Sequence, residues 1–320
     1  MSYNTFRIPN IENCQFLKNG SFVPLVPSQY KRLQDLCASI SANSHVKFVY
    51  RADDRLLEIY NVSDNKSTSL ADIVFMVGEK GNAFLKNLNT DCNHVTRVHI
   101  EKLFESLHDV VLNTSTNLHA VRNRIPEFIL VNHNLYRFFA NRQNLGRFVH
   151  AFTYQSEWIV NDYYEMFLHT ISRNGLNNKY SEMLSTSLEQ SAIQRFMHAN
   201  GIVYVGWVHD NGYIKFGDMN KRNDKIASFG LPTYISTLFP EQKEVCLKFG
   251  LPPHNIIGYF YDDQHFVVNH HFTLNNQNTK TEIDDILRHG FYIDQSNFLQ
   301  YLKKTKYVRG YDVVNNRYIH

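Results

Sequence analysis

The chain has 320 residues, of which 43% are hydrophobic and 20% charged, and its formal net charge is +3 at pH 7. This composition is typical of a globular protein with a large core, and the length suggests two domains. No apolar run approaches the ~20 residues that a membrane-spanning helix needs, and the first residues lack the features of a signal peptide. The four cysteines form no CxxC pair, which argues against a disulfide framework. We therefore expect an intracellular protein of the cytoplasm or nucleus, not secreted and without a membrane partner.

The charge and the aromatic content leave two kinds of partner open. A sequence pI near 8.5 permits binding to DNA or RNA, although a dedicated nucleic-acid binder usually has a pI above about 9. The 23 phenylalanines and 19 tyrosines are also typical of adaptable protein contact surfaces, so self-association is the second expectation.

Residues 1–199 show mainly helical patterns with short hairpins. Asn19-Gly20 between two apolar runs predicts a hairpin over residues 15–23, and Ser28 is placed to cap a helix that follows. A strand is expected over residues 46–50. Apolar residues at helical spacing predict further helices over residues 99–112, 155–172 and 180–199.

Residues 200–320 favour a small sheet flanked by helices. Runs at 202–208 and 213–216 are rich in β-branched and aromatic residues, and Asp210-Asn211-Gly212 between them predicts a second hairpin. Strands are also expected over 256–260 and 266–269, and helices over 240–249, 281–289 and 298–304. The sequence thus predicts a mixed α+β fold, with a helix-rich domain over 1–199 and a small α/β module over 200–320.

The helix predicted over residues 281–289 places three polar side chains in one narrow arc. At 100° per residue, Glu282, Asp285 and His289 share a side, opposite an apolar stripe. Carboxylates with an imidazole could hold a divalent cation such as Mg²⁺ or Mn²⁺. The alternative is a solvated polar face opposite the core.

The order of these elements resembles the GIY-YIG nuclease superfamily over about residues 201–291. A first strand with Val203-Tyr204-Val205 is followed by Lys215-Phe216-Gly217, in place of the second Tyr-Ile-Gly triplet, and then by the basic helix start around Lys225. The closest branch is that of phage and insect-virus proteins, in which a Lys-Ile-Gly-like triplet takes this place.

The resemblance implies a metal-dependent phosphodiesterase. Tyr204 and Lys215 would lie at the scissile phosphate, Arg222 or Lys225 would clamp it, and Glu282 or Asp285 would hold Mg²⁺ or Mn²⁺. The sequence departs from the family where a lysine, Lys225, aligns with the catalytic arginine. Because Lys and Arg are not equivalent for bidentate phosphate contact, an inactive nuclease-like module stays open.

The C-terminal tail combines basic and aromatic residues. Its tyrosines are interspersed with the basic residues Lys303, Lys304, Lys306 and Arg309. This combination can bind the backbone of a single-stranded nucleic acid and stack its bases, although the solvated end of an ordinary helix has the same composition.

The alternative to the nuclease hypothesis is a non-enzymatic viral structural or assembly protein, such as a capsid or occlusion component.

Overall fold

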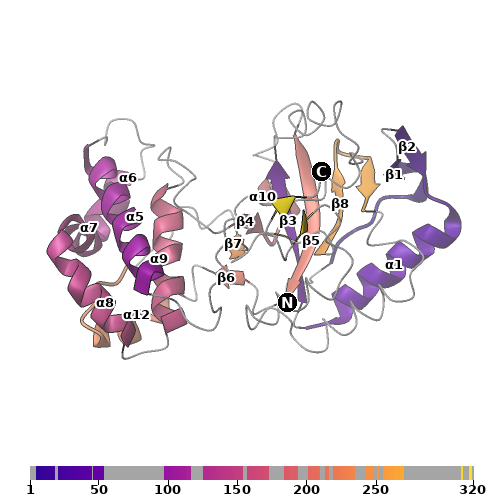
Figure 1. The fold of residues 1–320 in the computed structure, drawn as a ribbon. Helices are drawn as coiled ribbons and strands as arrows, with labels where there is room; N and C mark the ends of the chain where they lie inside the picture. The colour runs from indigo at the N-terminus through magenta and orange to yellow at the C-terminus, as the bar shows by residue number, and fades with distance from the viewer. Residues whose placement is uncertain are drawn as a thin grey trace.

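The computed structural model of the protein describes fifteen segments of the chain. They are residues 5–18, 21–44, 46–53, 97–116, 125–153, 157–172, 184–193, 201–209, 213–215, 219–234, 243–247, 251, 255–269, 311–312 and 317–318. In these segments the fold is mixed α+β, as predicted, with a group of helices at one end of the molecule and a sheet at the other (Figure 1).

The described residues form the following elements. The helices are α1 (Pro27–Ala42), α5 (Arg97–Thr116), α6 (Ile125–Val131), α7 (His133–Ala140), α8 (Leu145–Thr153), α9 (Glu157–Ser172), α10 (Gln190–Ile193) and α12 (Asn223–Ser228), with 3₁₀ turns η1 (Ile11–Asn13) and η3 (Arg142–Asn144). The strands are β1 (Cys14–Lys18), β2 (Ser21–Pro24), β3 (Val46–Asp53), β4 (Leu184–Ser187), β5 (Ile202–His209), β6 (Tyr213–Lys215), β7 (Glu244–Leu247), β8 (Ile256–Phe260), β9 (Phe266–Val268), β10 (Tyr311–Asp312) and β11 (Arg317–Tyr318).

Nine of these strands form one sheet in the order β2-β1-β9-β8-β5-β3-β4-β7-β6. All neighbours are antiparallel except β1 and β9, which are parallel. The sheet takes strands from both sides of residue 200, and its longest pairing joins β3 to β5 over eight residue pairs. The proposed division of the chain at residues 199 and 200 stays a prediction.

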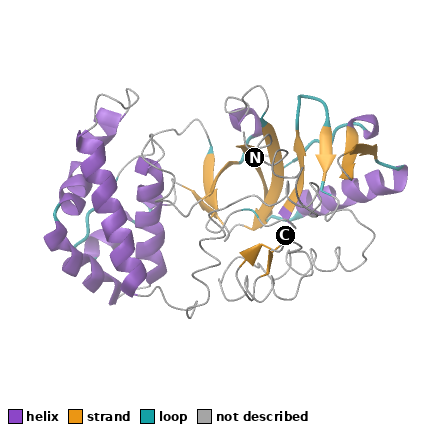
Figure 2. Ribbon diagram, turned by 45° about the horizontal axis from the view of Figure 1, so that its top comes forward, coloured by secondary structure: helices purple, strands orange, loops and turns teal. Residues whose placement is uncertain are grey.

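The N-terminal hairpin and the helix after it are confirmed. β1 pairs with β2 from Gln15 opposite Pro24 to Lys18 opposite Ser21, and residues 19 and 20 lie outside the described residues. Helix α1 begins after Val26, so Ser28 is not its cap; instead the Gln29 side chain accepts a hydrogen bond from the Val26 backbone N–H at 3.0 Å. The apolar stripe of α1 covers one face of the sheet (Figure 2).

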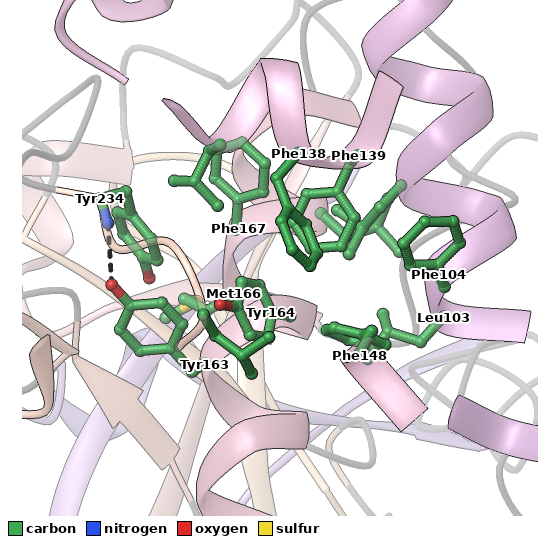
Figure 3. Close-up of a cluster of buried hydrophobic side chains, with 14 of the residues drawn as sticks. Leu103, Phe104, Phe138, Phe139, Phe148, Tyr163, Tyr164, Met166, Phe167 and Tyr234 are labelled. Carbon is green, nitrogen blue, oxygen red and sulfur yellow. Dashed lines mark hydrogen bonds between the residues drawn. The ribbon is translucent and has the colours of Figure 1, made fainter. Parts of the chain in front are cut away.

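Helices α5 to α9, with α12, form what we call the helical lobe. The stripe predicted for residues 99–112 is buried in α5, and it packs against α7, α8 and α9 around a cluster of aromatic rings (Figure 3). Phe139 lies near the centre, with its ring centroid 5.5 Å from Phe148 and 5.2 Å from Tyr164, both close to edge-to-face. Such pairs add about 0.5–1.5 kcal/mol each beyond the burial of their area.

Three further predictions, all of secondary-structure elements, are wrong in the residues that the structure describes. Strands β5 and β6 form no hairpin, because β3, β4 and β7 lie between them in the sheet. The helices expected over 180–199 and 240–249 are contradicted at Leu184–Ser187 and Glu244–Leu247, which are the paired strands β4 and β7. The sequence around each of these four-residue strands favours a helix. The pairing with other strands of the sheet overrides this local propensity.

Candidate functional site

Tyr204, the first predicted catalytic residue, lies in the core of the sheet. It is on the central strand β5, its side chain is 1% exposed, and it packs in a cluster of aliphatic side chains with Tyr259, whose ring centroid is 5.9 Å away. In this position the tyrosine ring contributes to packing between strands.

Lys215 lies on β6 at the far end of the sheet, where its partner across the ladder is Val245. Four strand steps separate β6 from β5, and at a spacing of about 4.8 Å per step this is roughly 19 Å. The structure therefore does not bring Lys215 and Tyr204 to one phosphate.

The two candidate phosphate clamps lie beside each other at the start of α12. Arg222 makes an ion pair with Asp162 of α9, with 3.6 Å between Nη1 and Oδ2, and its side chain is 33% exposed. Lys225 is exposed on α12. Arg222 is thus engaged with the helical lobe, and Lys225 faces solvent.

The remaining predicted site residues lie outside the described residues. These are the metal ligands Glu282, Asp285 and His289, and the basic tail residues Lys303, Lys304, Lys306 and Arg309. The Mg²⁺ or Mn²⁺ site and the nucleic-acid-binding tail stay predictions.

A polar network holds the segment around α12 against α9. The Tyr163 hydroxyl donates to Asn223 Oδ1. The same hydroxyl accepts a hydrogen bond from the Tyr234 backbone N–H at 2.8 Å (Figure 3). Asn223 in turn donates from Nδ2 to the Tyr234 carbonyl oxygen at 3.1 Å, and Tyr164 donates to the Pro232 carbonyl oxygen at 2.7 Å. Burial raises the pKa of Tyr163 and Tyr164, so these two hydroxyls stay protonated and donate.

A second polar cluster lies where the end of α9 meets β4 and β7. His169 Nε2 is 3.5 Å from Glu244 Oε1, and the two side chains are 3% and 7% exposed. The Cys246 thiol donates to the same Glu244 oxygen at 3.7 Å, and His169 Nε2 is 2.8 Å from Ser185 Oγ. We call His169, Glu244 and Cys246 the junction triad, because it joins the helical lobe to the sheet.

The junction triad has the residue types of a metal site. One ligand atom from each of the three side chains lies within 4.8 Å of the others. Within the residues that the structure describes, it is the only such group of three or more His, Cys, Asp and Glu side chains.

Sequence reasoning missed this cluster because it predicted a helix over β7. On a helix, Glu244 and Cys246 would point about 200° apart, whereas on a strand residues two apart share a face. The pattern Glu-Val-Cys, with the apolar residue between the two polar ones, was the available signal. His169 could not be assigned to them from sequence, since it comes from a different element.

The outer edge of the sheet carries a different kind of feature. In the described residues β2 is the last strand, and all four of its residues are exposed. Phe22 and Val23 on it, and Val26 just after it, are 44%, 41% and 51% exposed. We call these three residues the edge patch.

An aromatic stack anchors one side of the edge patch. The Phe22 ring lies on Tyr261, with 5.2 Å between centroids, and Tyr261 lies on His265 at 5.4 Å. His265 Nδ1 is held by Asp262 Oδ2 at 2.7 Å. Burial alone would raise the pKa of Asp262, but the backbone N–H groups of His265 and Gln264, with the His265 side chain, lower it. The stack therefore fixes Phe22 in an exposed position.

The comparisons with known proteins provide no family. No protein-family model, no curated protein and no solved structure matches the chain. The resemblance to the GIY-YIG nucleases stays a prediction. In the described segments, no helix has the length and apolar character to cross a membrane.

Proposed function

We propose that the protein is a non-enzymatic structural protein that assembles with further copies of itself through the edge patch. What supports the proposal is the position of three exposed, large apolar side chains, Phe22, Val23 and Val26, at the outer strand of the sheet. Single exposed apolar residues are normal, but a group of them at a strand edge is typical of a protein contact surface.

The backbone of β2 favours a symmetric pairing. Lys18 and Ser21 lie opposite each other with two residues between them in the chain, and paired residues at this spacing in an antiparallel ladder exchange both of their backbone hydrogen bonds. The N–H and C=O of the next residue, Phe22, therefore point away from β1. Two copies of β2 can pair antiparallel about Phe22, so that each Phe22 donates to and accepts from the same residue of the second copy. This is the self-complementary contact of a two-fold dimer.

Pro24 limits how far such pairing extends. It occupies the next position whose N–H would point outward, and a proline has no N–H to donate. The contact then depends on one pair of backbone hydrogen bonds and on the side chains of Val23 and Val26. This combination favours a specific dimer contact and opposes open-ended strand addition.

The test is the mass of the protein in solution as a function of its concentration. The wild type is expected to dimerise, and Val23→Lys with Val26→Lys is expected to weaken the dimer at least about tenfold, because the lysines would place like charges across the contact and remove the apolar surface. The matched control is Leu130→Lys with Val131→Lys, which changes two exposed apolar residues of α6.

The control variant should associate as the wild type does. A wild type that stays monomeric at its highest attainable concentration contradicts the proposal. So does a dimer that the edge variant leaves intact. The nuclease hypothesis depends on the acidic helix over residues 281–289, outside the described residues, and the geometry of Tyr204 and Lys215 lends it no support.

A further inference from the structure

We propose that the junction triad is a Zn²⁺ site that fastens the helical lobe to the sheet. The inference is independent of self-association, because the triad lies where α9 meets β4 and β7, and the edge patch lies at the opposite end of the strand order.

The two distances to the shared Glu244 oxygen are close to those of a tetrahedral site. With Zn–N and Zn–O bonds near 2.0–2.1 Å and a Zn–S bond near 2.3 Å, N and O ligands lie about 3.3 Å apart, and S and O ligands about 3.6 Å apart. His169 Nε2 is 3.5 Å from Glu244 Oε1, and Cys246 Sγ is 3.7 Å from the same oxygen. The third pair of atoms, His169 Nε2 and Cys246 Sγ, lies within 4.8 Å, so a side-chain rotation that brings these two atoms closer would enclose an ion.

The elements hold the three ligands from two directions. Residues 244 and 246 lie on one face of β7, since successive side chains of a strand alternate between faces. The last turn of α9 presents His169 to that face. An ion bound here would link the helical lobe to the sheet directly.

The charges also balance. A thiolate from Cys246 and the Glu244 carboxylate together carry the −2 charge that neutralises Zn²⁺, while His169 binds as the neutral imidazole. A neutral complex is favoured where the side chains are nearly excluded from water, because an uncompensated buried charge is costly. On binding, the Cys246 thiol gives its proton to solvent, so the affinity increases with pH.

The type of ligand selects the metal. Thiolate, imidazole and carboxylate together are ligands that Zn²⁺ takes in proteins, whereas Mg²⁺ and Ca²⁺ prefer oxygen alone. Ser185 Oγ, 2.8 Å from His169 Nε2, must give up this contact when the imidazole turns to the ion. The burial of the triad favours a structural ion over a catalytic one.

The experiment uses the full-length chain, stripped with a chelator and then loaded with Zn²⁺ or with Co²⁺ as a spectroscopic probe. After removal of excess metal, the wild type should retain one ion per chain. With Co²⁺ it should show the sulfur-to-cobalt charge-transfer band of a thiolate ligand and the intense visible bands of tetrahedral Co²⁺. Mg²⁺ in excess should displace neither ion.

The variants assign the binding to the triad. Cys246→Ser, His169→Gln and Glu244→Gln should each weaken Zn²⁺ binding at least about tenfold, and Cys246→Ser should abolish the charge-transfer band. The control is Cys37→Ser, which changes a different buried thiol on α1 and should leave both the stoichiometry and the band unchanged.

The wild-type measurements decide the matter even if a variant does not fold. A chain that retains no Zn²⁺ and gives no charge-transfer band contains a hydrogen-bonded polar cluster only, and the proposal is then wrong. It is equally wrong if a folded Cys246→Ser chain binds the ion as tightly as the wild type. Zn²⁺ should also raise the unfolding temperature of the wild type and of Cys37→Ser, because an ion bound only by the folded state stabilises it.

Discussion

Two buried tyrosines of the helical lobe differ in the hydrogen-bond partners of their hydroxyls. The Tyr163 hydroxyl joins Asn223 and the Tyr234 backbone N–H, whereas the Tyr136 hydroxyl has no hydrogen-bond partner in the described part of the chain. Both side chains are almost wholly buried. The pair therefore separates the contribution of the hydroxyl from that of the ring.

We expect Tyr163→Phe to lower the free energy of unfolding by about 1–3 kcal/mol, because it leaves the buried Tyr234 N–H and the Asn223 side chain without their partner. Tyr136→Phe, the matched control, should change stability by less than about 0.5 kcal/mol or raise it slightly, since it removes an unpaired buried oxygen. Urea unfolding at neutral pH measures both. Equal losses in the two variants would show that the Tyr163 network contributes nothing beyond packing.

At the scale of single residues, the sequence identifies the type of a side chain better than its surroundings. The sequence predicts a strand at Tyr204, but a strand residue can face the core or solvent, and the layers packed on the two faces of the sheet decide which. Both faces of β5 are covered: Val203 and Val205 pack in one buried cluster, and Tyr204 packs in another. The signal that pointed to catalysis was a local pattern, and it contained no information on this environment.

At the scale of helices and strands, two glycines form a second matched pair. A Cβ added to Gly258 on β8 would lie 2.3 Å from the Val267 carbonyl oxygen and 2.5 Å from the Phe266 ring. A Cβ added to Gly146 on α8 would have nothing within 4 Å. The strand requires glycine because of its neighbours, and the helix does not.

We therefore expect Gly258→Ala to lower the free energy of unfolding by about 1–3 kcal/mol or more, because β8 and β9 must move apart. Gly146→Ala should raise it by up to about 0.5–1 kcal/mol, since alanine loses less conformational entropy than glycine in a helix. Thermal unfolding followed by circular dichroism would measure both changes. A neutral Gly258→Ala would mean that the strands do not pack as closely as the structure has them.

The elements that sequence predicted well are those with strong local patterns. These are the stripes of α1, α5 and α9, the pairing of β1 with β2, and the apolar runs of β8 and β9. The failures at β4, β7 and the expected β5–β6 hairpin have a common cause. These strands pair with segments distant in sequence, and local turn and propensity signals do not encode such pairings.

At the scale of the whole molecule, helix α9 brings together polar groups from several distant segments. The Arg222–Asp162 pair, the Tyr163 network and the junction triad all lie along α9 or against it. Helix α9 could be predicted from its apolar stripe, but the partners of its polar residues could not, because they lie on α12 and β7. The candidate metal site thus follows from tertiary structure, while the mixed α+β class already follows from local patterns.

The burial of many phenols and thiols predicts how the whole molecule responds to alkali. Burial raises the pKa of Tyr50 to about 12, and it raises those of Tyr164 and Tyr234 well above 10. Burial, aided by the Glu12 charge, raises the pKa of Cys14 to about 12. In the unfolded chain these groups titrate at their usual values, near 9 for the thiol and 10 for the phenols.

Between about pH 9 and pH 12 the unfolded chain therefore binds fewer protons than the folded chain, and the free energy of unfolding must fall as the pH rises. The stabilisation is fully present below about pH 9. Each phenol ionised only in the unfolded chain lowers the free energy of unfolding by about 1.4 kcal/mol per pH unit. Urea midpoints measured from about pH 8 to 11 should be level at first and then fall steeply. In Tyr50→Phe the slope of the free energy of unfolding against pH should be shallower by the contribution of one phenol. A midpoint that stays level up to about pH 11 would mean that these hydroxyls reach water in the folded protein.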